Sequence, residues 1–195
     1  VVRNIRRIGV SMIADLVVRE WFPTETARVV LDLDHDAIAK HTIDFMDLQD
    51  SYTTYHDYER NQEWQKHPEV QKLKVDILEA TIQYMARTSR KPFKDEPIIF
   101  IWANVYKEHD EHGAHNHPRA LVSGTYYCTA DESHSPIRFD TPTLNHKMHD
   151  TQDIDRSFVS IRPNKGDMLL WPSWLMHRVS AQKKTPVPRV SISFN

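Results

Sequence analysis

The first half of the chain has apolar positions with a helical period. Segment 34–48 carries one apolar stripe, and Asp34 or Asp36 can cap its start. Segment 67–88 repeats the pattern, with Pro68 in a favourable place for a first helical turn. The members of the two stripes are Ile38, Ile43, Phe45 and Met46, then Val70, Leu73, Ile77, Ile82 and Met85. The pattern predicts two amphipathic helices that cover a sheet.

From Pro97 onward the apolar period changes from helical spacing to two. Polar connections, or connections that contain Pro or Gly, separate six segments that are typical of strands. These segments are 98–106, 120–128, 136–139, 158–161, 167–171 and 189–194. Helices followed by strands indicate an α+β domain whose sheet closes as a sandwich or jelly roll.

The length of 195 residues predicts one domain. We expect residues 1–195 to comprise a helical support, about residues 1–95, and a strand core, about residues 96–195. Segment 141–157 is the longest expected loop, and it is a candidate lid.

Charge and composition give no sign of a nucleic-acid or membrane partner. Lys and Arg number 25 against 27 Asp and Glu, which leaves no basic field for phosphate backbones. The single cysteine, Cys128, fits a reducing interior and a buried strand position. Segment 8–18 looks like the apolar part of a signal peptide, but Asp15 interrupts it. We therefore expect a cytoplasmic protein, with Met12 as an alternative start that leaves the origin of residues 1–11 open.

Histidines supply the candidate chemistry, because no Gly-rich phosphate loop is present. Eight of the twelve histidines fall between His109 and His177. If His115 and His117 lie on extended backbone, their side chains share a face and can reach one metal ion. His177, after an apolar strand and a Pro-Ser-Trp turn, is the candidate third ligand, and a facial set of three leaves positions open for catalysis.

Other assignments of these histidines remain open. A histidine pair at this spacing is often just the polar face of an edge strand. His109 and His112 are expected to be solvated loop residues, although His109 and Glu111 form a rival His-x-Glu pair.

The last predicted strand carries a second chemical signal. Arg189, Ser191 and Ser193 share one face. A buried guanidinium is costly without an anionic partner, and its fork matches a carboxylate. A carboxylate co-substrate bound to both a metal and Arg189 would account for the three histidines and for Arg189 with Ser191.

Together these residues resemble the Fe(II)/2-oxoglutarate-dependent dioxygenases, whose double-stranded β-helix carries His-x-Asp/Glu, a distal His, and an Arg or Lys for the co-substrate. The matching positions are His115-x-His117, His177 and Arg189, in the same order. More specifically, HxHP…SGxYY, GDMLLWPSWLMHRV and RVSISFN are similar to a group of 2-oxoglutarate/iron oxygenases found in bacteria and phages, and more distantly to prolyl hydroxylases. The resemblance covers residues 98–195 strongly.

This resemblance implies a cupin-like jelly roll with N-terminal packing helices, and Fe(II) and 2-oxoglutarate as cofactors. It implies that Tyr127, on one strand face with Ser123, assists Arg189 and Ser191 at the distal carboxylate of 2-oxoglutarate. Asn104 or Tyr106 would meet the chelating end. It implies no catalytic residue beyond the metal centre.

The expected reaction is hydroxylation of a small-molecule or peptidyl substrate by dioxygen, with release of succinate and CO2. Trp171, Trp174 and Tyr126 are candidate pocket residues, although aromatic strand residues are more often core. One departure from the family pattern is His117, which stands where a carboxylate is usual, so Glu111 stays an alternative ligand. Two other functions remain: a three-histidine cupin-type dioxygenase without a co-substrate, and a non-enzymatic metal-binding β-sandwich module.

Overall fold

The computed structural model describes residues 23–47, 51–88, 97–142 and 157–195. The expectations for segment 8–18, for Met12 and for most of the candidate lid lie outside the described residues. Within the described part of the chain, no helix is both long and apolar enough to cross a membrane.

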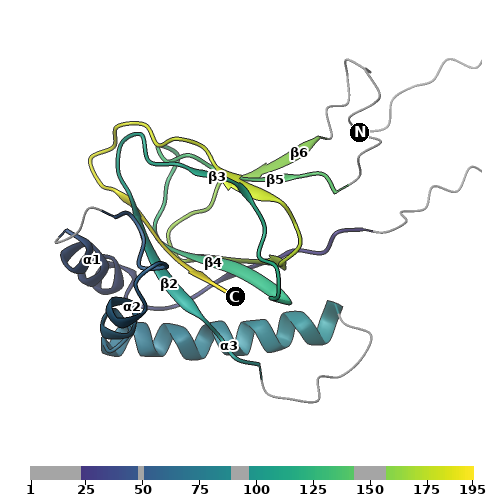
Figure 1. Cartoon of the computed structure of the whole chain (residues 1–195), viewed down its shortest axis with the longest axis horizontal. Coiled ribbons are helices and arrows are strands. Elements are labelled where there is room, and N and C mark those ends of the chain that lie inside the picture. The colour runs from purple at the N-terminus through teal and green to yellow at the C-terminus, as the bar shows by residue number, and fades with distance from the viewer. Residues whose placement is uncertain (1–22, 48–50, 89–96, 143–156) are drawn as a thin grey trace, which may run out of the picture.

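Two antiparallel sheets form the centre of the molecule (Figure 1). The larger sheet has the order β1 (Ala27–Val30), β7 (Asp167–Pro172), β4 (Val122–Thr129), β9 (Arg189–Phe194) and β2 (Ile101–Tyr106). The smaller sheet has the order β3 (His112–His115), β8 (His177–Val179), β5 (Ile137–Asp140) and β6 (Phe158–Ile161). Strands distant in sequence are therefore neighbours in both sheets.

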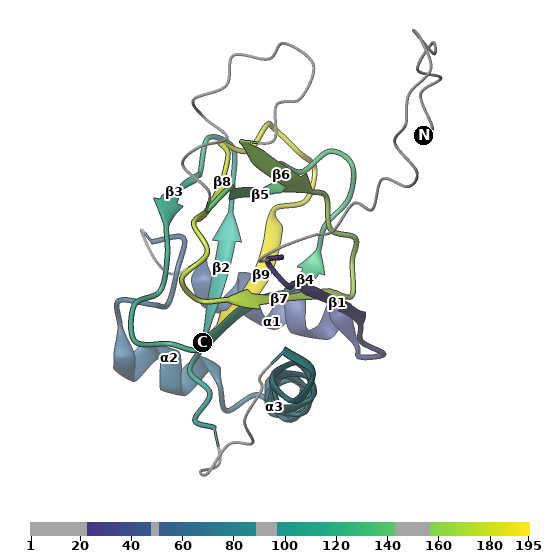
Figure 2. The same cartoon turned by 90° about the vertical axis from the view of Figure 1, so that its right-hand side faces the viewer.

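Three helices lie on the side of the larger sheet that faces away from the smaller sheet (Figure 2). They are α1 (His35–Met46), α2 (Tyr58–Trp64) and α3 (Pro68–Thr88). The Asp34 side chain accepts a hydrogen bond from the Ala37 backbone amide and caps α1, as the sequence predicts for one of its two candidates. The inward faces of α1 and α3 bury Ile38, Leu73 and Ile77 against the sheet.

The larger sheet is buried on both faces, which explains the nearly continuous burial of β2, β4, β7 and β9. One face packs on the helices, and the other packs Tyr127, Leu169 and Trp171 against Ile137 and Phe139 of the smaller sheet. Cys128 is fully buried on β4, as expected.

Periodicity correctly predicts α1, α3 and the six long or apolar strands, but it misses four elements. The missed elements are β1, α2, β3 and β8. They have three to seven residues, too few for a period to stand out. Ile82, placed on the apolar stripe of α3, is 46 % exposed, and Thr81 and Tyr84 are buried instead.

Gly124 lies at a crowded point of the larger sheet. A Cβ atom there would lie 2.6 Å from the Leu169 carbonyl oxygen and closer still to the Phe194 ring. We expect Gly124→Ala to lower the free energy of unfolding by about 1–3 kcal/mol, the usual range for overpacking a core. Chemical denaturation measures this change. The matched control is Gly113→Ala on β3, where nothing lies within 4 Å of an added Cβ; an equal loss in both variants would contradict the packing argument.

Candidate metal centre

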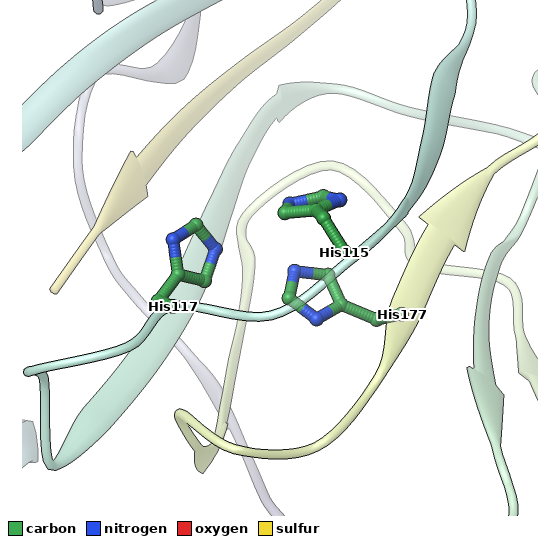
Figure 3. A group of neighbouring side chains, drawn as sticks. All are labelled: His115, His117 and His177. Carbon is green, nitrogen blue, oxygen red and sulfur yellow. The ribbon is translucent and has the colours of Figure 1, made fainter.

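Three histidines converge between β3 and β8 (Figure 3). His115 is the last residue of β3, His177 is the first residue of β8, and the two are register partners. His117 joins them from the connection between β3 and β4. One ring nitrogen from each of the three lies within 4.8 Å of the others. A single metal ion could therefore bind all three imidazoles.

Backbone carbonyls fix the orientation of two of the rings. The His115 Nδ1 atom lies 2.8 Å from the Gly113 oxygen, and the His177 Nδ1 atom lies 2.9 Å from the Leu175 oxygen. A carbonyl oxygen only accepts hydrogen bonds, so each Nδ1 carries the proton. Each Nε2 is left with a free lone pair, as a metal ligand requires.

The structure corrects the reason why His115 and His117 come together. They do not share one strand face, because β3 ends at His115. The His117 backbone amide donates a 3.0 Å hydrogen bond to the Ser173 carbonyl oxygen, in the turn before β8. The turn that precedes His177 therefore also positions His117.

The metal-free triad is electrically neutral near neutral pH. Burial, with a smaller contribution from neighbouring imidazoles, lowers the pKa of His177 to about 3 and that of His117 to about 4. Burial also lowers the pKa of His115. Neutral imidazole is the form that binds metals, so the site does not need to lose protons first.

A small pocket is lined by all three histidines and by Arg189. The Arg189 side chain is almost fully buried, and among the described residues its Nε and Nη1 atoms have no hydrogen-bond partner. The Tyr127 hydroxyl, also buried, lacks a partner too. The guanidinium carbon lies 5.0 Å from the ring centre of Tyr106 and 5.1 Å from that of Tyr127. A buried cation and a hydroxyl without partners are a site for an anion.

The predicted co-substrate residues divide into two groups. Arg189, Ser191, Tyr127 and Tyr106 all line the pocket. Asn104 is buried next to it, where its Nδ2 donates to Ser193 Oγ at 3.0 Å and its Oδ1 has no partner among the described residues.

Ser123 lies apart from that group. Although it shares a strand face with Tyr127, its Oγ atom contacts Asn195 Oδ1 at 2.7 Å and Ser173 Oγ at 2.9 Å, on the His117 side. Thr125, which lies between them on the same face, lines the pocket and contacts Ser193 at 3.2 Å. Alternation along a strand places Ser123, Thr125 and Tyr127 on the same face, so the sequence could also have predicted Thr125 as a pocket residue.

His112 was predicted to be a solvated loop residue, and this is wrong. It lies on β3, its ring stacks on that of His115 at 4.1 Å, and its Nδ1 atom is 3.2 Å from the Tyr106 hydroxyl. Burial and the nearby imidazoles lower its pKa to about 4. His109 and Glu111 are exposed, and among the described residues the metal-binding group consists of His115, His117 and His177. The rival His109 and Glu111 pair has no support in this geometry.

The candidate aromatic residues occupy three different environments. The Trp171 ring packs 4.9 Å from that of His177 and lines the pocket. Trp174 is 55 % exposed. Tyr126 is buried in the helix-facing core, where its hydroxyl bonds to His35 Nδ1.

A protein-family model described as "Putative 2OG-Fe(II) oxygenase" matches residues 100–195. The matched segment, which is the strand-rich part of the chain, is similar to this oxygenase family. The protein is a 2-oxoglutarate-dependent enzyme, and its three-histidine site could hold the iron. No curated protein matches the sequence.

Solved structures of distant oxygenases share the fold. A prolyl-4-hydroxylase from Pseudomonas putida has a TM-score of 0.56 and 12 % identity, over 88 % of this chain and 86 % of that one. HygX from Streptomyces hygroscopicus, with nickel and 2-oxoglutarate bound, has a TM-score of 0.57 and 12 % identity, over 88 % and 81 %. The carbocyclase SnoK from nogalamycin biosynthesis has a TM-score of 0.59 and 11 % identity, over 88 % and 79 %. At such low identity these matches extend to the fold alone.

The pKa of His177 predicts that the metal-free protein becomes less stable in acid. Its pKa is about 3 in the folded state against 6.5 for an ordinary histidine, so between these values only the unfolded chain takes up the proton. The free energy of unfolding should fall by about 1.4 kcal/mol per pH unit below pH 6.5 from this residue, and not above it.

Denaturation of the metal-free protein between about pH 5 and 7 measures the effect. His177→Asn should make the dependence less steep by about 1.4 kcal/mol per pH unit, and the other buried histidines, whose pKa values are also lowered, should keep the rest. His109→Asn, at an exposed position with φ of 71° that Asn tolerates, should leave it unchanged. Equal slopes for the wild type and His177→Asn would contradict the prediction.

Proposed function

We propose that His115, His117 and His177 bind Fe(II) and that Arg189 binds the distal carboxylate of 2-oxoglutarate, in an enzyme that hydroxylates an unactivated C–H bond. One observation carries the proposal. The Nε and Nη1 atoms of the buried Arg189 guanidinium lack a hydrogen-bond partner among the described residues, and Arg189 lines the same pocket as the three imidazoles. Such a cation is expensive unless an anion joins it.

The pocket residues fit the two ends of a dicarboxylate co-substrate. Arg189 offers unpaired N–H groups and Tyr127 offers a hydroxyl, which suit one carboxylate. Burial raises the pKa of Tyr127, so this hydroxyl keeps its proton and can donate it in a hydrogen bond. Ser191 lines the pocket beside Arg189, and Asn104 and Tyr106 are our candidates for the chelating end. Ser123, by its contacts, has a different role.

A set of three neutral imidazoles has chemical consequences. They would leave Fe(II) with its full charge of +2, where a carboxylate ligand would reduce it to +1, so the site favours an anionic chelator. When bound, iron and 2-oxoglutarate supply the activation of dioxygen, with succinate and CO2 as the products of the co-substrate. The contribution of the chain is to hold the ligands, orient the co-substrate through Arg189, and exclude water with Trp171 and Tyr106.

We also propose that the two sheets form a double-stranded β-helix, or jelly roll, within a single domain. The support is their strand orders, β1-β7-β4-β9-β2 and β3-β8-β5-β6, with a shared apolar layer between them. A cytoplasmic location stays a prediction.

The substrate proposed is a small molecule or a peptidyl residue. A prolyl residue is the first candidate, because the fold is similar to that of a prolyl-4-hydroxylase. A three-histidine dioxygenase without a co-substrate is less well supported, since it gives Arg189 and Tyr127 no partner.

Anaerobic titration tests the metal and co-substrate together. Fe(II) followed by 2-oxoglutarate should produce a visible charge-transfer band, and admission of oxygen should release succinate. His177→Ala should abolish both, because it removes one of three ligands. His56→Ala, at an exposed position, is the matched control. Folded wild-type protein that gives neither the band nor succinate would reject the function.

Arg189→Gln tests the co-substrate site separately from the metal. We expect the 2-oxoglutarate concentration for half-maximal succinate release to rise about tenfold or more, because charged hydrogen bonds are lost. Binding of Co(II) should persist. The metal-free variant should be at least as stable as the wild type, since a buried cation without a partner is removed.

Arg87→Gln, exposed on α3, is the matched control for this substitution. An unchanged 2-oxoglutarate concentration for half-maximal succinate release in Arg189→Gln would contradict the assignment of Arg189 to the co-substrate.

A further inference from the structure

We infer that Asn195 is a positioning residue that fixes the proton of His117 on Nδ1, so that Nε2 is free to bind the metal. The inference rests on the proposed function, because it assigns His117 as a ligand. Asn195 lies at the end of the pairing between β9 and β2, where its backbone exchanges two hydrogen bonds with Phe100, of 2.9 and 3.0 Å. Its side chain is therefore held by the sheet.

His117 is the one member of the triad whose Nδ1 atom does not face a backbone carbonyl. The partners of His115 and His177 are carbonyl oxygens, which accept only. The partner of His117 Nδ1 is the Asn195 side-chain amide, at 3.3 Å. An amide can present either its oxygen or its NH2 group to this nitrogen, because the two ends have the same shape. The backbone alone therefore does not set the tautomer of His117.

A chain of hydrogen bonds continues from Asn195 into the protein. The far end of the amide lies 2.7 Å from Ser123 Oγ, and that atom lies 2.9 Å from Ser173 Oγ. Both serines are 1 % exposed. Because each hydroxyl can donate or accept, the chain can run in either of two directions.

Only one direction is compatible with metal binding through Nε2. In that direction His117 Nδ1–H donates to the amide oxygen of Asn195, the amide NH2 donates to Ser123, and Ser123 donates to Ser173. In the opposite direction the amide donates to Nδ1, and the proton of the neutral imidazole then blocks Nε2. Metal binding therefore selects the direction in which Asn195 is the acceptor, as Gly113 and Leu175 are for the other two rings.

The same chain also links the two segments that carry the ligands. The Ser173 carbonyl oxygen accepts a hydrogen bond from the His117 backbone amide. The Ser173 hydroxyl is the last group in the series of hydrogen bonds that begins at Asn195. It precedes His177 by four residues. Ser123 thus acts through Asn195 on the metal side of the site, which accounts for its separation from Arg189.

Two substitutions at Asn195 test whether His117 needs a hydrogen-bond acceptor at this position. Asn195→Asp keeps an oxygen facing His117 and should bind Co(II), followed by its visible absorption, within a few-fold of the wild type. Asn195→Leu has a similar size but no acceptor, and it should bind Co(II) about 10- to 100-fold more weakly, the usual effect of losing such a partner. Asn164→Asp and Asn164→Leu, at an exposed position, are the matched controls.

A second measurement uses the unmodified protein, so it decides even if Asn195→Leu does not fold. Proton–nitrogen NMR of the Zn(II)-loaded wild type should place the His117 proton on Nδ1, as for His115 and His177. A proton on Nε2 of His117 overturns the inference. So does Co(II) binding by Asn195→Leu at wild-type affinity, or an equal loss in Asn195→Asp and Asn195→Leu.

These outcomes differ from failure of the proposed function. Wild-type protein that binds Co(II) but releases no succinate would reject the oxygenase assignment and leave the Asn195 result valid.

Discussion

The antiparallel pairing of β3 with β8 is the contact on which the site depends. Two strands of four and three residues place His115 directly opposite His177, and the ring centres lie 4.3 Å apart. Neither strand is stable alone, because so few residues form too few hydrogen bonds. β5 extends the sheet beyond β8, and the apolar layer of Ile137, Phe139 and Trp171 fixes it against the larger sheet. The geometry of the ligands is therefore a consequence of packing between the sheets.

The pocket combines two electrostatic environments. Burial holds three imidazoles neutral and ready to bind a cation. Arg189 lines the same pocket, with two aromatic rings about 5 Å from its guanidinium carbon and no hydrogen-bond partner for its Nε and Nη1 atoms among the described residues. A dicarboxylate that chelates a metal would satisfy both environments at once. The protein bears the cost of a buried cation in its free state, and ligand binding would recover it.

The partners of the imidazoles show how local structure supports the chemistry. His115 and His177 each bond to the carbonyl two residues earlier in the chain, so their tautomers follow from local backbone conformation. His117 depends on Asn195 and, through it, on serines of β4 and of the turn before β8. The tautomer of His117 thus depends on residues from three separate segments of the chain. Of the three ligands, His117 depends most on the tertiary structure.

Sequence alone is enough to predict the helices α1 and α3, six of the nine strands that the structure describes, and four candidate site residues: His115, His117, His177 and Arg189. Periodicity is a local property, and a charged residue on an inward strand face is visible without coordinates. Three features become clear only from the folded chain: why His115 and His117 meet, that His112 lines the pocket, and that Ser123 lies apart from Arg189. These depend on where a four-residue strand ends and on which distant segment lies beside it. Short polar strands carry no period, and contacts between segments 50 or more residues apart leave no trace in the spacing of residue types.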